Sequence, residues 1–532
     1  MDLVASIEND FKEGNIKSAL KKFSSLENEN QVLSQNLIEL KARCFAEEDN
    51  LDESIKILES SPQTANGDLI KNYKLCLKVE TNSPTKIKEQ NHYAIFLKWL
   101  NENGAKLEKV KIVYYEENYR GIHAIKSIKK GEIFVSIPSK LLIFTQNGIN
   151  SHIGSILYSL KWECISVHLL YISLFIIEEI KKEHSFWLPY FNILPNNVAN
   201  IPLFYNEEEK KQLIGTRMLK QFDIDNNWYD EIYEKLIEIC PEIKSISLDD
   251  IKFWMSLLIT RLFFLKEGEK NKDYAMVPFA DMFNCDSKKN DMIDWGYNDS
   301  NNTFEIQALR DIERGETIYL SYGRKSQYRF LYNYGFIDEN NDYIQKFLGF
   351  EIPEDIPNYE DKIKILQSHY IELKLSNDFN SQLNSRQFTI LRWLLDGRQF
   401  SEMDYFEVLS KTLTLKYPLD NKVEIGIISK SNEIQVLKFL ILICENHLKG
   451  FIQSAEEDKR LIDDSNLTFN LRNIYRLNYN KKKFLLKIIE LSQNGIKFLD
   501  GSANMNLIDE FKNDWGYPYY QSIQEFLSNN NH

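Results

Sequence analysis

Two short segments near the middle of the 532-residue chain contain the residues best suited to binding and chemistry. The first runs from Val277 to Asp286 and contains Asp281 and Asn284, and the second runs from Tyr319 to Ser326 around Tyr322. Their carboxylate, amide and phenolic hydroxyl can orient a ligand through hydrogen bonds. No Cys-x-x-Cys spacing occurs anywhere in the chain, so we expect no zinc knuckle and no metal site.

An arginine precedes these segments in apolar surroundings. The stretch from Phe253 to Leu265 has the apolar density of a buried helix, and Arg261 lies within it. A guanidinium group in such a helix needs a buried anion, because an unpaired charge away from water is strongly unfavourable. A surface salt bridge is the alternative interpretation of this residue.

The two segments resemble the signature motifs of SET-domain methyltransferases, which are an Asp-x-x-Asn-His-type motif and a tyrosine that follows a strand. Cys285 stands here in place of the histidine. The likeness extends to the subfamily that includes plant RuBisCO large-subunit methyltransferase and the actin histidine methyltransferase. It implies S-adenosylmethionine as cofactor, Tyr322 as the catalytic residue, and Asn284 in a knot-like crossing of chain segments. The cofactor-binding residues that it implies are Asn118, Arg120, Gly121, Arg261, Asn284, Cys285, Tyr322 and Phe336.

Methyl transfer from S-adenosylmethionine to an amine is an in-line displacement, in which positive charge spreads toward the acceptor nitrogen. A dry channel that aligns the reactants supplies much of the rate. A lysine acceptor must arrive neutral although its free pKa is about 10.4, and an apolar channel near a sulfonium lowers that pKa. The Tyr322 hydroxyl would orient the amine, so no metal and no strong base is required.

The segment from Asn118 to Ile122 resembles the family's Gly-x-Gly loop, which lets the backbone approach the methionine part of the cofactor. Gly121 is retained, but Tyr119 replaces the first glycine. A non-glycine residue is strained at positive φ, so this substitution puts the loop conformation in doubt.

A spaced pattern of residues occurs twice and predicts a β fold. Ala124-x-x-x-Ile128-x-x-Gly131-Glu132 is repeated as Ala308-x-x-x-Ile312-x-x-Gly315-Glu316. We interpret residues 124–132 and 308–316 as two related strand-turn-strand units, called here the first and second repeat units. The residues between them are mostly helical in pattern, with an insert at about 145–265. The aromatic and proline clusters within residues 185–195 are expected to be packing elements.

The predicted fold class is α+β, in three parts. Residues 1–84 form a short helical extension that is similar to tetratricopeptide (TPR) repeats, with a plain helical extension as an equal alternative, and a linker follows around Pro84. Residues 85–345 form the SET domain with its insert. Residues 346–532 form a helical substrate-binding domain, with a capping box at Ser454 and a buried helix over residues 434–448.

The formal net charge of -13 argues against direct nucleic-acid binding and favours a protein substrate with a basic acceptor segment. We interpret the basic run Lys481-Lys482-Lys483 as a solvated helix face. The longest apolar run, from Ile165 to Ile177, is too short to span a bilayer and predicts a buried core helix. Six scattered cysteines and the absence of a secretory signal pattern predict reduced thiols in a cytoplasmic protein, with the nucleus as a further location.

The residues expected around the substrate side chain are Phe263, Ala280 and Tyr334. The resembled histidine methyltransferases carry asparagine and tryptophan where this chain has Phe263 and Ala280. Apolar and aromatic walls suit a lysine stem, whereas an imidazole needs a polar partner for its second nitrogen. We therefore predict a lysine methyltransferase that acts on a non-histone protein. A histidine methyltransferase and a catalytically silent SET-fold scaffold are the alternatives.

Overall fold

The computed structural model describes residues 2–530 except 29–32, 49, 61–68, 71–72, 75–86, 117–118, 268–270, 342, 344, 367, 377–381, 399–425 and 515. The chain divides into two compact units, Met1–Val198 with Tyr229–Gly323, and Ala199–Trp228 with Arg324–His532. The predicted linker at Pro84, the thiol of Cys76 and the predicted cofactor contact of Asn118 lie outside the described residues.

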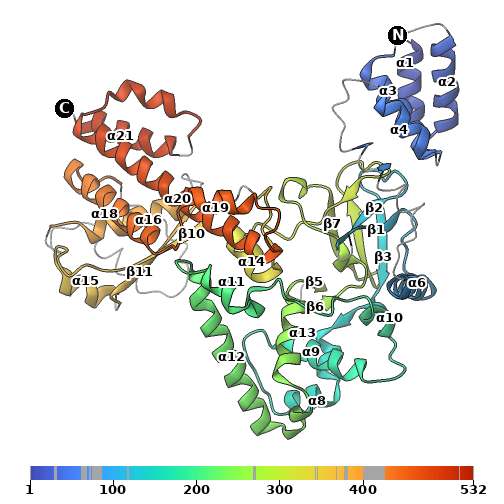
Figure 1. The fold of residues 1–532 in the computed structure, drawn as a ribbon, viewed down its shortest axis with the longest axis horizontal. Coiled ribbons are helices and arrows are strands. Elements are labelled where there is room, and N and C mark those ends of the chain that lie inside the picture. The colour runs from blue at the N-terminus through green and yellow to red at the C-terminus, as the bar shows by residue number, and fades with distance from the viewer. Residues whose placement is uncertain are drawn as a thin grey trace. The chain divides into compact units, whose positions relative to one another are not determined.

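The first unit begins with two helical hairpins, in agreement with the helical extension predicted for residues 1–84 (Figure 1). The helices are α1 (Asp2–Lys12), α2 (Ile16–Asn28), α3 (Gln35–Glu47) and α4 (Leu51–Glu59). The fully buried Phe23 of α2 and Ala42 of α3 belong to the two small cores beneath them. The Asn50 side chain caps α4 by accepting the Glu53 N–H.

Three small antiparallel sheets form the β part of this unit, with strand orders β1-β2-β9, β3-β8-β7 and β4-β6-β5. The strands are β1 (Val110–Glu116), β2 (Tyr119–Ala124), β3 (Ile133–Pro138), β4 (Ile143–Phe144), β5 (Leu262–Glu267), β6 (Asn271–Met276), β7 (Ile293–Asn298), β8 (Thr303–Ala308) and β9 (Thr317–Ile318). Strands from both sides of the insert therefore pair with each other.

The two repeat units bind each other reciprocally. At their centre, the N–H groups of Ile128 and Ile312 each donate to the other residue's carbonyl at 2.8 Å. Gly315 of the second repeat unit donates its N–H to the Ala124 carbonyl at 2.8 Å. In the same way, the N–H of Gly131 in the first repeat unit donates to the carbonyl of Ala308 in the second repeat unit at 2.7 Å. The repeated spacing thus describes two β units that pair around a local pseudo-twofold axis.

Side chains repeat this reciprocity. His123 and Gln307 each precede the alanine of their unit, and each bonds to the glycine carbonyl of the other unit. His123 Nδ1 lies 2.9 Å from the Gly315 oxygen, and Gln307 Nε2 lies 2.7 Å from the Gly131 oxygen. Both glycines have φ of +83°, a conformation that favours glycine over residues with a Cβ.

Helices flank and interrupt the strands, with short 3-10 turns between them. They are α6 (Ile87–Glu102), α7 (Thr145–Ile149), α8 (His152–Ser159), α9 (Val167–Ile180), α10 (Leu188–Phe191), α11 (Glu207–Lys211), α12 (Arg217–Ile239) and α13 (Leu248–Ile259). The 3-10 turns are η1 (Ser139–Leu141), η2 (Pro202–Phe204), η3 (Pro241–Ser245), η4 (Ala280–Met282) and η5 (Ser287–Lys289). Helix α9 is buried along most of its length, which confirms the predicted core helix, although Ile165 before it is exposed.

The predicted helix from Phe253 to Leu265 is wrong in its last turns. Helix α13 ends at Ile259, and Leu262 begins β5, which pairs with β6 over its whole length. Ladder pairing with β6 and an aromatic cluster around Phe263 outweigh the helical pattern of the apolar run. Arg261 therefore lies between a helix and a strand.

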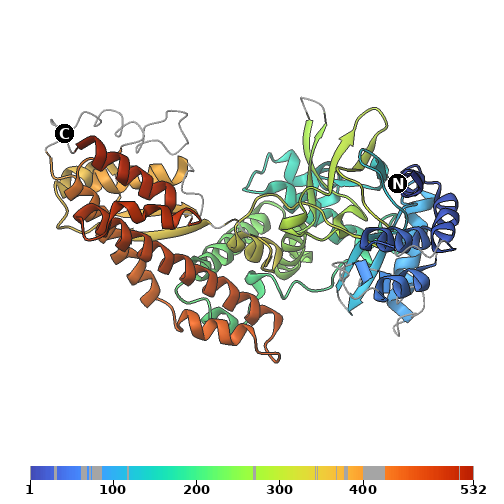
Figure 2. The same cartoon turned by 90° about the horizontal axis from the view of Figure 1, so that it is seen from above.

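The second unit is mainly helical, as predicted, and adds a two-stranded sheet. Its elements after α12 are α14 (Gln327–Tyr334), β10 (Gln345–Glu351), α15 (Tyr359–Leu366), β11 (Tyr370–Ser376), α16 (Gln382–Leu394), α18 (Lys430–Lys449), α19 (Ala455–Ile462), α20 (Phe469–Asp500), η7 (Met505–Phe511) and α21 (Tyr517–Asn530). The long helix α20 packs against α18, α19 and α21 (Figure 2). The capping box at Ser454 is present at the start of α19.

The interpretation of Lys481 and Lys482 as a solvated face is wrong. Both are buried on α20, because α19 and neighbouring loops cover that face of the helix. Lys482 forms an ion pair of 2.5 Å with the fully buried Asp458. In the first turn of α18, Glu433 accepts two hydrogen bonds, of 2.7 and 2.8 Å, from the Arg392 side chain. No helix in the described ranges is long and apolar enough to cross a membrane.

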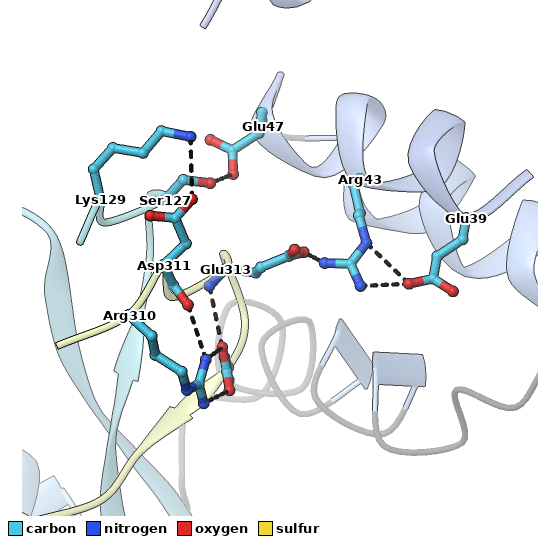
Figure 3. Close-up of polar contacts among 9 residues, drawn as sticks. Glu39, Arg43, Glu47, Ser127, Lys129, Arg310, Asp311 and Glu313 are labelled. Atoms are coloured by element: carbon cyan, nitrogen blue, oxygen red, sulfur yellow. Dashed lines mark hydrogen bonds and ion pairs between the residues drawn. The ribbon is translucent and has the colours of Figure 1, made fainter. Parts of the chain in front are cut away.

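Helix α3 contacts the loops of the repeat units through charged groups (Figure 3). Arg43 pairs with Glu313 in the second repeat unit and with Glu39 on its own helix. Glu47 accepts a hydrogen bond from the Ser127 hydroxyl in the first repeat unit. Polar contacts therefore join the amino-terminal helices to both repeat units.

Exchanging the charges of Arg43 and Glu313 tests this contact. Each single variant, Arg43→Glu or Glu313→Arg, is expected to lower the thermal midpoint of the first unit by a few degrees, because like charges then face each other. The double variant should recover only part of the loss, because the negative charge at position 43 still faces Glu39, with a coupling energy of about 1 kcal/mol that shrinks in high salt. Differential scanning calorimetry gives all four midpoints, and purely additive losses would contradict the contact.

Burial of His123 makes the fold sensitive to acid. Its Nδ1 faces a carbonyl, which only accepts, so Nδ1 carries the proton and Nε2 accepts from the Thr317 hydroxyl at 3.1 Å. Burial lowers the pKa of His123 from 6.5 to about 4. The unfolded chain therefore binds a proton that the folded chain refuses between these values, and stability falls as pH falls through this window.

We expect acidification from pH 7 to pH 4.5 to cost about 2 kcal/mol of stability through His123. His123→Gln should be less stable than the wild type at pH 7 but should lose less on acidification. His184→Gln, at an exposed position, serves as control and should follow the wild type. Thermal midpoints measured across this range decide, and parallel curves for His123→Gln and wild type would refute the assignment.

Candidate active site

The chain leaves β6 through a strained turn that places Asp281. Phe279 is fully buried with φ of +73° and ψ of -45°, values close to a γ-turn that costs a non-glycine residue roughly 1–3 kcal/mol. The Met282 N–H donates to the Phe279 carbonyl at 3.1 Å and closes the following turn. Such strain persists only where surrounding contacts hold it, and here it turns the Asp281 side chain into the interior.

Asp281 provides the buried anion that Arg261 was expected to need. Its Oδ2 lies 2.7 Å from a terminal nitrogen of Arg261, and the Asp281 side chain is fully buried. The same guanidinium nitrogen donates to the Asp281 backbone carbonyl at 3.2 Å. Burial acts to lower the pKa of Arg261, but Asp281, Tyr190 and Tyr322 outweigh it and raise the pKa above its ordinary value. The arginine stays charged in the interior.

A second donor to this carboxylate comes from the helical insert. The hydroxyl of Tyr190 on α10 donates to Asp281 Oδ2 at 2.7 Å. Burial, followed by the charge of Asp281, raises the pKa of Tyr190 well above its ordinary value, so the hydroxyl keeps its proton. From the sequence, this tyrosine was predicted only to pack. The sequence signals of a buried polar network were Arg261 in an apolar stretch and the carboxylate of Asp281 in the motif that follows it.

Asn284 joins segments that are distant in sequence. Its side-chain amide donates to the Arg120 carbonyl on β2 at 2.6 Å. Its own carbonyl accepts the Leu320 N–H at 2.8 Å, and it forms a parallel bridge with Tyr319. The chain before Tyr322 therefore lies against the Asp-x-x-Asn segment, which is the crossing that the motif predicted.

The hydroxyl of Tyr322 has a fixed direction. It donates to the Phe283 carbonyl at 2.9 Å, one residue before Asn284. The half-buried Cys285 follows on the other side of Asn284. Gly323, with φ of +83°, turns the chain away directly after the tyrosine. The hydroxyl of the catalytic candidate Tyr322 thus contacts the short stretch of backbone that carries the cofactor-binding candidates Asn284 and Cys285.

The start of β2 accommodates Tyr119, in place of the family's glycine, without backbone strain. Tyr119 begins the strand opposite Glu116, does not have positive φ and is about half exposed. Gly121 pairs with Val113 in the ladder with β1. The guanidinium of Arg120 lies 5.7 Å from the centre of the Tyr93 ring on α6. The doubt that Tyr119 raised about this loop is therefore removed for the residues from Tyr119 onward.

Two predicted substrate-side residues lie in apolar packing. Phe263 is almost fully buried, and its ring makes edge-on contacts at about 5 Å with Trp295 and Phe304. Ala280 is fully buried on η4, beside Asp281. Neither of these two side chains offers a hydrogen-bond donor or acceptor of its own.

Tyr334 and Phe336 belong to the second unit. Their rings pack with each other and with Phe330, at centre distances of 5.5 to 6.4 Å. The Lys325 ammonium lies 5.6 Å from the Tyr334 ring. Gly335 between them has φ of +75° and a tight contact with Asn200, so a side chain would not fit there. The three rings form one cluster at the end of α14.

Family comparisons match both parts of the chain. Residues 119–323 match the model of the SET domain, and residues 353–485 match the Rubisco LSMT substrate-binding domain. Actin-histidine N-methyltransferase from Gallus gallus is 28% identical over 418 residues, which cover 76% of this chain and 69% of that protein. The Homo sapiens protein of the same name is 26% identical over 420 residues, covering 76% and 68%.

Solved structures agree on the fold. The SET domain of LSMT bound to lysine and AdoHcy superposes with a TM-score of 0.61 at 24% identity, over 77% of this chain and 93% of that one. Rubisco LSMT bound to AdoMet gives 0.60 at 23% identity, over 79% and 94%. The chain is a SET-domain protein methyltransferase. Methyltransferases of this family use S-adenosylmethionine as methyl donor, and this is the cofactor of the present enzyme.

Three buried polar atoms of the methyltransferase fit that cofactor. Nε of Arg120, Nε of Arg261 and Oδ1 of Asp281 are buried without a hydrogen-bond partner. A buried unsatisfied polar atom costs about 1–3 kcal/mol, so two donors and one acceptor near one site indicate a polar ligand. The amino-acid end of S-adenosylmethionine has a carboxylate and an ammonium, which complement these donors and this acceptor. Among the described residues no group of side chains suits a metal ion.

Asn284→Ala is expected to weaken cofactor binding about tenfold, because it releases the Arg120 carbonyl and loosens the crossing on which β2 rests. The matched control is Asn290→Ala, which removes a comparable amide-to-carbonyl bond from the exposed loop of η5. Isothermal titration with S-adenosylhomocysteine gives both Kd values. Equal affinity of wild type and Asn284→Ala would contradict the role of this residue.

Proposed function

We propose that this methyltransferase transfers a methyl group from S-adenosylmethionine to a lysine side chain of a non-histone protein. The observation that carries the proposal is the fixed hydroxyl of Tyr322, held by the Phe283 carbonyl at 2.9 Å beside the crossing of Asn284. A hydroxyl that donates its hydrogen to a carbonyl can also accept an N–H at its oxygen. Tyr322 can therefore orient an incoming amine without taking its proton.

The bound cofactor supplies an electrophilic methyl group on a positively charged sulfur. The protein's task is to align the acceptor nitrogen with this group and to exclude water. Asp281 is unsuited to act as general base, because its Oδ2 accepts from Arg261 and Tyr190 and its Oδ1 is the acceptor that fits the cofactor's ammonium. We infer that desolvation lowers the pKa of the acceptor ammonium, so that its proton passes to water, rather than to a carboxylate base, before methyl transfer.

The acceptor type is inferred from the apolar positions beside the site. Phe263 packs edge-on against Trp295 and Phe304 and offers no hydrogen bond that would hold an imidazole in one tautomer. Ala280 adds no polar group. Apolar surroundings suit the four-carbon stem of lysine, so they favour lysine over histidine.

Histidine methylation is the second candidate, because the similar curated proteins are named actin-histidine N-methyltransferases. Both acceptors need an aligned, neutral nitrogen, so Tyr322 can serve either reaction. The two candidates differ in the polar partner that an imidazole requires, and identification of the methylated residue distinguishes them.

We further propose a substrate with a basic acceptor segment, since the enzyme's formal net charge is -13. The two amino-terminal hairpins are proposed to form a TPR-like surface for this or another protein partner, supported by their repeat spacing. A cytoplasmic location, extending to the nucleus, suits the unpaired thiols, of which Cys44, Cys240 and Cys444 are buried.

Labelling of cell extract with isotopic S-adenosylmethionine tests the function. Wild-type enzyme should label a protein, and Tyr322→Phe should reduce the rate roughly a hundredfold or more with little change in cofactor Kd, because the hydroxyl acts mainly in the transition state. The exposed Tyr158→Phe is the control and should retain activity. Mass spectrometry of the labelled protein should place the methyl group on lysine. Methylhistidine as the main product would overturn the acceptor assignment, and an unlabelled extract in which cofactor still binds would favour a silent scaffold.

A further inference from the structure

Tyr190 connects the helical insert to the buried charge pair of the active site. Its side chain is fully buried, and its ring stacks on Phe96 of α6 at 5.9 Å between centres. Phenylalanine would pack equally well on Phe96. The hydroxyl adds one specific contact, the hydrogen bond of 2.7 Å to Asp281 Oδ2.

This hydroxyl determines which oxygen of Asp281 stays available. Tyr190 and Arg261 both donate to Oδ2, each at 2.7 Å, and Oδ1 is buried without a partner. Two donors on one oxygen fix the rotation of the carboxylate about its Cβ–Cγ bond. Without the hydroxyl, the carboxylate can rotate so that Arg261 contacts both oxygens, a bidentate arrangement that guanidinium groups favour. That rotation would engage Oδ1 with the guanidinium and would remove this acceptor from the site.

We propose that Tyr190 is a positioning residue for the amino-acid end of S-adenosylmethionine. By holding Asp281 through Oδ2, it keeps Oδ1 available to accept from the cofactor's ammonium. This inference rests on the proposed cofactor-dependent function and assigns to the insert a role in cofactor binding. It distinguishes the amino-acid end, which depends on Tyr190, from the adenosine end, which does not.

The experiment compares two ligands in one variant. S-adenosylhomocysteine has both ends of the cofactor, whereas 5′-methylthioadenosine lacks the ammonium and the carboxylate. Tyr190→Phe should weaken S-adenosylhomocysteine about tenfold in isothermal titration and leave the Kd of 5′-methylthioadenosine unchanged. A residue with only a packing role would weaken both ligands equally.

Tyr205→Phe is the matched control. Tyr205 is also a buried tyrosine, but its hydroxyl has no hydrogen-bond partner, so its removal should change neither Kd. Should Tyr190→Phe not fold, Asp281→Asn provides the same comparison, because its amide keeps the shape of the side chain but lacks the negative charge. It should also weaken S-adenosylhomocysteine selectively.

Each result decides between distinct statements. Equal loss for both ligands, or no loss for either, overturns the role of Tyr190 while the cofactor assignment stands. Wild-type protein that binds neither ligand overturns the cofactor assignment and this inference together. Selective loss for S-adenosylhomocysteine in Tyr190→Phe supports the proposal.

Discussion

Reciprocal pairing of the two repeat units is the constraint on which the active site depends. In each repeat unit the glycine N–H donates a hydrogen bond to the other repeat unit. The carbonyl of Gly315 also bonds to the His123 side chain, and the carbonyl of Gly131 bonds to the Gln307 side chain. The first unit continues from β2, which carries Arg120 and Gly121, and the second leads through β9 to Tyr322. Cofactor loop and catalytic tyrosine are thus held in register by one set of backbone hydrogen bonds, whatever the length of the insert between them.

Asp281 is the second organising element, and it acts through charge rather than through pairing. A fully buried carboxylate is tolerated only with strong donors, and here Arg261 and Tyr190 supply them from two distant parts of the insert. The strained Phe279 turn points the carboxylate at these donors. The insert is therefore part of the active site, since its folding decides whether this charge is compensated.

Much of this arrangement follows from the sequence because it depends on local spacing. The repeated alanine-isoleucine-glycine pattern predicted the paired β units, and Arg261 in apolar surroundings predicted a buried anion. Long-range packing was not predictable in the same way. The run around Lys481 has the composition of a surface, yet Asp458 on another helix compensates its neighbour, and the end of α13 was set by pairing with β6. The role of Tyr190 escaped because a tyrosine among apolar residues has the same local pattern with or without a partner.

The reciprocal pairing also determines when the enzyme can form during synthesis. His123 contacts a carbonyl 192 residues further along the chain, so a ribosome that adds about 5–20 residues per second separates the two partners by about 10–40 seconds. During this interval β2 has only β1 as a neighbour, and its other edge stays open to non-native pairing. A nascent chain with an open strand edge is a substrate for chaperones, so the yield of folded enzyme in cells depends on how well that edge is protected until the second repeat unit emerges.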